Sequence, residues 1–226
     1  MTLQTARPEA VLFDLDGTLV DTAEEFELVL QAMRADRNLP PLPRQAIRAS
    51  VSNGAAALVT LAFDCPADSA DHEELRQEFL DRYEKNLGLA ARPYAGLRDL
   101  ISALGTAGIP WGVVTNKFRR FAEPLMAALD FDPAARALVT PCDVATAKPD
   151  PEGIILGCRQ AASRPENSIY IGDHWRDIEA GNRAGCMTVA AAYGYLADND
   201  DPAQWGADLV VHSSQELAIS IKRIFQ

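Results

Sequence analysis

The stretch Ala10-Val-Leu-Phe13 runs directly into Asp14-Leu15-Asp16-Gly17-Thr18, so an apolar run ends in two carboxylates, a glycine and a threonine. Apolar residues bounded by turn residues are typical of a short buried strand. Asp14 and Asp16 lie two positions apart, which puts both side chains on the same side of the pleat. Gly17 lets the backbone turn sharply there. The stretch therefore predicts a buried strand that presents a pair of carboxylates at its end.

Apolar, β-branched runs recur along the rest of the chain and alternate with helical patterns of about ten to fifteen residues. The strand-like runs lie at 111–115, 137–140, 168–171, 187–190 and 207–211. The helical patterns lie at 96–107, 119–129, 151–162, 175–184 and 214–224. This alternation predicts an α/β fold, a Rossmann-like parallel sheet with helices on both faces. Because ligands bind at the carboxyl ends of the strands in such sheets, we expect the functional residues just after the runs.

The stretch from residue 22 to about residue 90 interrupts the alternation, because it contains no convincing strand and is helical throughout. It begins with a capping-box pattern, Thr22-x-x-Glu25, and ends in an amphipathic helix. The insertion follows the first strand directly. We therefore predict two folding units, an α/β core made of residues 1–20 and 92–226 and an all-helical cap made of residues 21–91.

The composition disfavours several classes of partner. With 32 acidic and 21 basic residues, the 226-residue chain has a formal net charge of −11, which repels nucleic acid and anionic membranes and attracts divalent cations. The four cysteines form no C-x-x-C pair and lie in apolar contexts, which favours buried free thiols. The N-terminal MTLQTARPEA lacks the regions of a signal peptide, and no uninterrupted apolar run approaches the ~18 residues of a membrane span. We therefore expect a cytoplasmic monomer or homodimer with no nucleic-acid or membrane partner.

Polar residues follow other strand-like runs as they follow the first. Thr115 and Asn116 supply a hydroxyl and an amide of the kind that bind phosphate oxygens, although this pair is also ordinary in turns. Lys148 precedes Asp150 and Pro151, which fit the N-cap and first position of a helix. The lysine therefore lies beside a helix end that favours an anion, and a solvated surface lysine is the alternative.

A second acidic pair, Asp173 and Asp177, comes after the run Ser168-Ile-Tyr-Ile171 and the single residue Gly172. If a helix begins at the next residue, both carboxylates lie on one side of its first turn, although acidic residues there can also be simple caps. Together with the first acidic pair they offer oxygen ligands that suit Mg²⁺, whereas zinc would need thiolates or paired histidines. The set predicts a magnesium-dependent site in which one carboxylate attacks phosphorus and another acts as acid and base.

These motifs resemble, in their order along the chain, the four signatures of the haloacid dehalogenase superfamily of phosphatases. The matching motifs are Asp14-x-Asp16-Gly17-Thr18, Thr115-Asn116, Lys148-Pro149 and Gly172-Asp173-x-x-x-Asp177. The resemblance implies that Asp14 is the nucleophile and a metal ligand, and that Asp16 is the general acid/base and gives its carbonyl to the metal. The remaining implied roles are metal binding by Asp173, support of that site by Asp177 and Gly172, and phosphoryl binding by Thr115, Asn116 and Lys148.

The helical insert resembles the small cap of the same superfamily, which encloses a small phosphorylated metabolite when it closes. We expect substrate specificity to reside there, on the polar groups of Arg48, Ser52, Asn53 and Gly54. An alternative contact to a substrate carboxylate comes from the core side, from Lys117, Arg119 and Arg120.

Within the superfamily the chain is similar to phosphoglycolate phosphatases and, more narrowly, to N-acetylmuramic acid 6-phosphate phosphatases. The segments that carry this similarity are Gln31–Arg37, Trp111–Lys117, Arg120–Pro124, Tyr193–Tyr195 and Trp205–Val211. The resemblance implies hydrolysis of either ester through an aspartyl-phosphate intermediate, and for the muramic ester a place in peptidoglycan recycling. His174 and Trp175 depart from many relatives, which carry a small residue or Asp after the Gly-Asp pair.

Two other functions share these residue types. A phosphomutase of the same superfamily has the same nucleophile and acid/base pair and differs in what its cap admits. A receiver-like phosphoacceptor also places an Asp at a strand end with Mg²⁺, a hydroxyl and a lysine. The inserted cap and the second carboxylate at Asp16 disfavour the receiver-like alternative.

Overall fold

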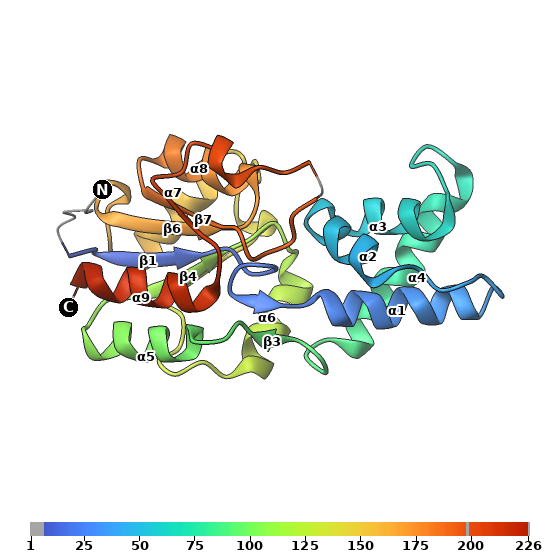
Figure 1. The fold of residues 1–226 in the computed structure, drawn as a ribbon, viewed down its shortest axis with the longest axis horizontal. Coiled ribbons are helices and arrows are strands. Elements are labelled where there is room, and N and C mark those ends of the chain that lie inside the picture. Colours follow the sequence, from blue (N-terminus) through green and yellow to red (C-terminus); the bar gives the residue numbers. More distant parts are fainter. Residues whose placement is uncertain (1–6, 198, 226) are drawn as a thin grey trace.

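A computed structural model describes residues 7–197 and 199–225 of the chain (Figure 1). Within these residues six strands form one sheet in the order β5-β4-β1-β6-β7-β8, and all of its strand pairs are parallel. The strands are β1 (Ala10–Phe13), β4 (Trp111–Val114), β5 (Ala137–Val139), β6 (Ser168–Gly172), β7 (Met187–Ala191) and β8 (Leu209–Val211). The predicted parallel α/β fold is confirmed, and the first strand of the chain lies inside the sheet between β4 and β6.

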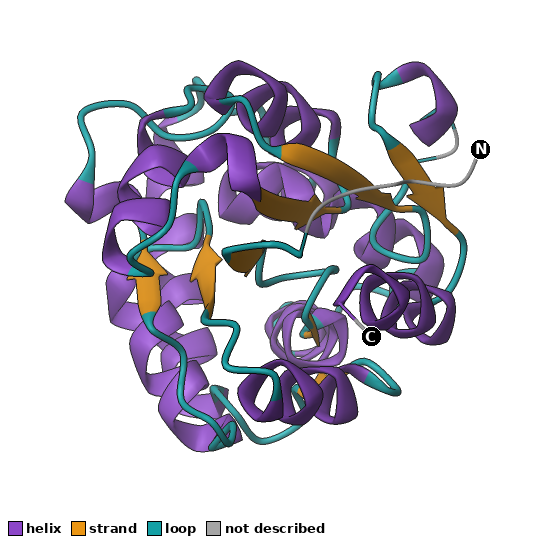
Figure 2. Cartoon of the chain, turned by 90° about the vertical axis from the view of Figure 1, so that its left-hand side faces the viewer, coloured by secondary structure: helices purple, strands orange, loops and turns teal. Residues whose placement is uncertain are grey.

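Helices cover both faces of this sheet. They are α5 (Leu97–Thr106), α6 (Arg119–Leu129), α7 (Glu152–Gln160), α8 (Trp175–Ala184) and α9 (Ser214–Phe225). Figure 1 shows α7 and α8 on one side of the strands and α5 and α9 on the other, and the turned view shows the strands between helices (Figure 2). Successive side chains of β1 point to opposite faces of the sheet. Phe13 lies in the apolar cluster that contains Leu100 of α5, whereas Leu12 lies in the cluster that contains Ile154 of α7.

The inserted segment is helical, as predicted, and occupies the end of the molecule opposite the chain termini (Figure 1). It contains α1 (Ala23–Ala35), α2 (Arg44–Ser50), α3 (Gly54–Phe63) and α4 (Ala70–Asn86), with a 3-10 turn at Val51–Asn53. These helices share an apolar cluster of their own. At its centre the rings of Phe26 and Tyr83 stack with centroids 4.5 Å apart, and Phe79 stacks on both. The segment thus has the separate core that a cap needs.

A short antiparallel ladder that the sequence did not predict joins the cap to the core. β2 (Val20–Asp21) pairs with β3 (Arg92–Pro93) where the chain leaves the core and where it returns. The domain boundaries predicted after residues 20 and 91 fall at this ladder. The division into two folding units stays a prediction. The ladder marks the place where the two predicted units are connected.

The capping box predicted at Thr22 and Glu25 is wrong. The Thr22 side chain makes no capping bond to α1 and instead donates to Asp16 Oδ1 at 2.6 Å. Oε1 of Glu25 accepts hydrogen bonds from the backbone N–H groups of Ala90 and Ala91 at 3.2 and 3.1 Å. Both side chains therefore bond to groups outside α1, because such partners compete with the local cap.

Residues 44–63 are long and apolar enough to cross a membrane by length and composition alone. In the structure they form α2, the 3-10 turn and α3, and the side chains of Ile47, Leu58 and Val59 are buried in the apolar cluster of the cap. These three side chains therefore contribute to the core of the cap.

The four cysteines are free, as predicted. Cys158 and Cys186 are buried, Cys65 is partly buried and Cys142 is exposed, so the expected burial holds for two of the four and is wrong for Cys142. Cys142 lies in the 3-10 turn at Pro141–Asp143, which contains no buried residue, and its apolar neighbours in sequence belong to the preceding strand.

Candidate active site

The loops at the carboxyl ends of β1, β4 and β6 bring the sequence-predicted polar residues together. Asp14 follows β1, Thr115 follows β4, and Asp173 follows β6. Lys148 comes from the loop before α7 and contacts Asp14. The neighbouring order β4-β1-β6 explains the convergence, because the three strands end side by side at one edge of the sheet.

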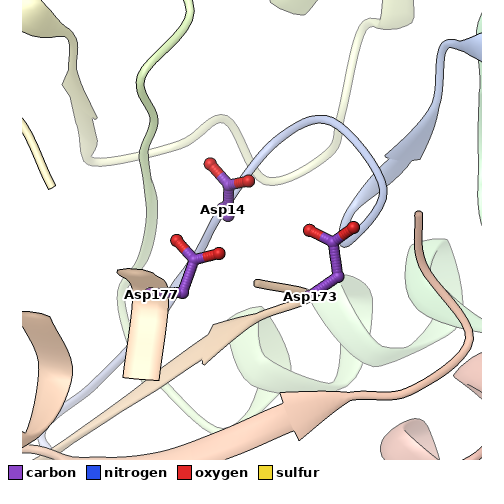
Figure 3. Close-up of side chains that lie close together, drawn as sticks. All are labelled: Asp14, Asp173 and Asp177. Atoms are coloured by element: carbon purple, nitrogen blue, oxygen red, sulfur yellow. The ribbon is translucent and has the colours of Figure 1, made fainter. Parts of the chain in front are cut away.

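Three carboxylates form the acidic part of this site (Figure 3). Asp14, Asp173 and Asp177 are buried, and each offers an oxygen that lies within 4.8 Å of the others'. Burial, opposed by the nearby Lys148 ammonium, raises the pKa of Asp14 to about 6. Burial and the Asp14 charge raise the pKa of Asp173 well above its usual range. A divalent cation bound by these oxygens would relieve both penalties, so the donor set fits a magnesium-type ion.

The carboxylate of Asp16 lies outside this cluster. Its two oxygens are 3.0 and 3.2 Å from Lys117 Nζ. Any contribution of Asp16 to a metal would therefore come from its main-chain carbonyl, which is what the family resemblance implies.

Lys148 is the buried cation of the site. Its Nζ lies 2.7 Å from Asp14 Oδ1, 2.6 Å from Asp177 Oδ1 and 2.9 Å from Tyr170 Oη. Burial would lower the pKa of Lys148, but the charges of Asp14 and Asp177 outweigh it and raise that pKa. The ammonium group is therefore charged at neutral pH and pairs with two carboxylates of the site.

Asn116 holds the Lys148 loop in place. Its side-chain oxygen accepts from the Lys148 N–H at 3.1 Å, and its amide donates to the Lys148 carbonyl at 3.0 Å. The side chain was expected to bind phosphate, but in this structure both ends of its amide are used to position the lysine. Thr115 Oγ1 accepts from the Lys117 N–H at 3.2 Å, which leaves its hydroxyl proton free to donate.

Close packing explains both glycines of the acidic motifs. A Cβ on Gly172 would lie 2.2 Å from Asp177 Cβ, and a Cβ on Gly17 would lie 2.1 Å from Asp173 Oδ2. Gly17 also has a φ of +81°, which other residues rarely adopt. Only glycine therefore allows the carboxylates to approach the backbone this closely.

His174 and Asp177 cap the helix that carries the second acidic pair. His174 Nδ1 accepts from the Arg176 N–H at 3.2 Å, and Asp177 Oδ2 accepts from the His174 N–H at 3.1 Å. Burial, with a further contribution from the Arg176 charge, lowers the pKa of His174 to about 4, so its ring is neutral at pH 7. His174, which departs from the family pattern, therefore has a structural role as the cap of α8.

Lys117, which pairs with the Asp16 carboxylate, also contacts the cap. Its side chain is 5% exposed, and its Nζ donates to Tyr83 Oη at 2.7 Å as well as to Asp16. The ammonium also lies 5.0 Å from the ring centroid of Phe26 and 4.8 Å from that of Tyr83. Asp16 is thus held by a core lysine that is itself surrounded by cap residues.

A cavity of about 460 Å³ lies between these residues and the cap. Ser52, Asn53 and Gly54 line it, as expected of specificity residues. Arg48 does not line it, because its guanidinium donates to Asp21 at 2.8 Å and to Tyr94 Oη at 3.0 Å beside the ladder. The placement of Arg48 gives no support to the predicted substrate contact.

Of the core-side cations, Lys117 lines the cavity, whereas Arg119 and Arg120 do not. Arg119 pairs with Asp143 at 2.6 Å, which explains its position. The sequence analysis did not identify several further lining residues, because a cavity between two folding units has no local signature. These residues are Phe26, Phe79, Leu80, Tyr83, Phe118 and Phe121 on the apolar wall, and Arg76 and Arg176 among the charged groups.

The parallel sheet, the strand-end carboxylates with a buried lysine, and the helical cap over them define an enzyme of the phosphoryl-transfer class with an α/β fold. Residues 8–185 match the family described as haloacid dehalogenase-like hydrolase, and the chain belongs to that family.

Relatives and solved structures narrow the class to phosphatases. The chain is 49% identical to the N-acetylmuramic acid 6-phosphate phosphatase of Pseudomonas aeruginosa, over 95% of each chain. It is 37% identical to a phosphoglycolate phosphatase of Xanthomonas campestris, over 93% of this chain and 95% of that one. The structure described as a predicted phosphoglycolate phosphatase from Haemophilus somnus superposes with a TM-score of 0.83, 27% identity and full coverage of both chains. The chain is therefore a phosphoric monoester hydrolase of this family.

Proposed function

We propose that this phosphatase hydrolyses N-acetylmuramic acid 6-phosphate and uses Mg²⁺. The observation that carries the proposal is the cavity of about 460 Å³ in front of Asp14. Cavities of ~300–1,000 Å³ hold ligands of the size of a phosphorylated amino sugar. A two-carbon ester such as 2-phosphoglycolate would leave most of this space to water. The 49% identity to the Pseudomonas aeruginosa phosphatase supports the same substrate.

In the proposed reaction Asp14 attacks phosphorus. Lys148 Nζ holds Asp14 Oδ1 at 2.7 Å, which leaves Oδ2 as the attacking oxygen. As the new oxygen–phosphorus bond forms, the bond between phosphorus and the sugar oxygen breaks. The carboxylic acid of Asp16 gives its proton to that leaving oxygen, and the chain then carries an aspartyl phosphate at position 14.

In the second step Asp16, now a carboxylate, takes a proton from a water whose oxygen attacks phosphorus. The bond to Asp14 breaks, inorganic phosphate leaves, and both aspartates return to their starting forms. The Lys148 ammonium and the Thr115 hydroxyl offset negative charge on the phosphoryl oxygens, which is usually the largest contribution to catalysis.

Mg²⁺ suits the ligands that we propose, because all of them are oxygens. They are the side chains of Asp14 and Asp173 and the main-chain carbonyl of Asp16, with Asp177 and Gly172 supporting the site. When bound, the ion would neutralise part of the charge on the carboxylates and on the phosphoryl group.

The remaining parts of the proposal concern location and assembly. Four free cysteines fit the reducing cytoplasm, where the muramic ester would arise during peptidoglycan recycling. One chain supplies all of the proposed site residues, so a monomer would suffice for activity. Sedimentation velocity at working concentration distinguishes the monomer from a homodimer.

The test is phosphate release from N-acetylmuramic acid 6-phosphate, 2-phosphoglycolate and common sugar phosphates, compared by kcat/KM with and without EDTA. We expect a preference of about 100-fold or more for the muramic ester, loss of activity in EDTA and recovery with Mg²⁺. A preference for 2-phosphoglycolate would replace the proposed substrate, and a requirement for a bisphosphate activator would indicate a phosphomutase.

A further inference from the structure

Four cationic side chains line the active-site cavity, and three of them are already paired with carboxylates. Lys148 contacts Asp14 and Asp177, Lys117 contacts Asp16, and Arg76 forms two 2.7 Å hydrogen bonds with Glu73. Arg176 is the fourth, and among residues 7–197 and 199–225 it forms no ion pair. Its positive charge is thus the one in this cavity that the described chain does not neutralise.

The Arg176 guanidinium is held in a defined position. Its Nη2 donates to the main-chain carbonyl of Ser52 at 2.5 Å, and its Cζ lies 5.9 Å from the ring centroid of Trp175. The side chain is half-buried, and Arg176 is the second residue of α8, two positions after the capping residue His174. A guanidinium has five N–H donors, and this single hydrogen bond to a described residue leaves capacity for a ligand in the cavity that Arg176 lines.

The same cap turn offers a second unused polar group. Ser52 lines the cavity, and its hydroxyl is buried and has no hydrogen-bond partner among the described residues. A buried hydroxyl without a partner carries a desolvation penalty, which a ligand group would remove. Arg176 and Ser52 thus form a second candidate site for an anion, made of residues other than Lys148.

We propose that Arg176, assisted by the Ser52 hydroxyl, binds the carboxylate of the substrate and selects for it. The inference rests on the proposed function, because N-acetylmuramic acid 6-phosphate carries a carboxylate on its lactyl ether in addition to its phosphate. Arginine pairs with carboxylates through two parallel hydrogen bonds, and such charge-assisted bonds are the strong ones. Since the guanidinium comes from the core and the hydroxyl from the cap, the bound carboxylate also joins the two units.

The test compares N-acetylmuramic acid 6-phosphate with N-acetylglucosamine 6-phosphate, which is the same sugar phosphate without the lactyl ether. We expect wild type to prefer the muramic ester, and Arg176→Gln to lower kcat/KM for it by about 10- to 100-fold, mainly through KM. For N-acetylglucosamine 6-phosphate the same variant should stay within about threefold of wild type. Ser52→Ala should reduce the preference by a smaller factor, about three- to tenfold.

Two further variants serve as controls. Arg159→Gln removes an equally charged residue that is exposed on α7 and does not line the cavity, and both substrates should be unaffected. Arg176→Lys keeps the charge but loses the two-pronged geometry, so it should restore only part of the preference. Circular dichroism and thermal unfolding confirm that each variant is folded.

The outcomes separate this inference from the proposed function. If Arg176→Gln slows both substrates equally, the residue serves the cap contact with Ser52 and the carboxylate site is wrong. If it slows neither, the site is also wrong, while turnover of the muramic ester still supports the function. If wild type does not hydrolyse the muramic ester at all but hydrolyses other phosphates, both proposals fail together.

Discussion

The two carboxylate–lysine pairs of the active site differ in where their partners come from. Asp14 and Lys148 are held entirely by the core, through Asp177, Tyr170 and the carbonyl of Val114. Asp16 and Lys117 are held partly by the cap, through the hydroxyls of Thr22 and Tyr83 and the ring of Phe26.

This difference suggests a division of labour. The proposed nucleophile keeps its geometry whatever the cap does, because each of its named partners lies on a strand, a loop or a helix of the core. The proposed acid/base depends on the cap through Lys117 and Thr22, so its geometry is complete when the cap is in this position. Changes to the Asp14–Lys148 pair should therefore abolish hydrolysis. Changes around the Asp16–Lys117 pair should lower the rate by an amount that depends on which contact is lost.

The largest effect is expected from Asp14→Asn, which breaks the core pair. Hydrolysis should fall by about 10⁴-fold or more, because the amide cannot form the covalent intermediate. Burial and neighbouring carboxylates raise the pKa of Asp14, so removing its charge should leave metal-free stability equal or higher in urea unfolding. Steady-state phosphate release measures the activity, and retention within tenfold of wild type would exclude Asp14 as the nucleophile.

The next effect is expected from Asp16→Asn, which removes the carboxylate of the cap-dependent pair. Loss of a general acid/base group lowers kcat by about 10²- to 10⁴-fold. Both half-reactions should slow, and rapid quench with acid trapping of the phosphoenzyme measures each one. A kcat within tenfold of wild type would mean that another group transfers the proton.

Part of this comparison could be predicted from the sequence. Asp14 and Asp173 come at the ends of short apolar runs and Lys148 lies in a loop that enters a helix, so the rule that ligands meet the carboxyl ends of parallel strands places them together. The helical cap was also predictable, because its strand-free stretch interrupts a regular alternation. These features could be predicted because each depends on residues that are close together in the sequence.

The contacts of Lys117 and Arg176 could not be predicted in the same way. Lys117 meets Asp16 from 101 positions away, and Arg176 meets Ser52 from 124 positions away. The sequence proposed Arg48 as the cap residue that contacts substrate, but its pairing with Asp21 at the ladder removes it from the cavity. Only the packing of cap on core decides which cations remain without a partner.

A smaller effect is expected from Lys117→Met, which keeps Asp16 but removes the cation that holds it. We expect kcat to fall by about tenfold with little change in KM, because a misoriented acid/base slows the step without weakening phosphate binding. Tyr83→Phe removes only the hydroxyl that Lys117 contacts and should cost about two- to threefold. The two variants are compared by steady-state kinetics, and an unchanged kcat in Lys117→Met would show that Asp16 does not need the cap.

The smallest effect concerns His174, whose ring caps the helix that carries Asp177, a partner of the core pair. Burial lowers the pKa of His174 from 6.5 to about 4 in the folded chain, so the unfolded chain binds the proton more tightly. The stability that depends on the neutral ring is therefore complete above pH 6.5 and is lost as pH falls toward 4. Between about pH 7 and about pH 5, the free energy of unfolding of wild type should fall by about 1 kcal/mol more than that of His174→Asn, after allowance for solvent screening. The variant serves as the reference because asparagine caps a helix without titrating. Urea unfolding of both proteins in EDTA measures the difference, and parallel pH profiles would show that protonation of the His174 ring does not lower the stability of the fold.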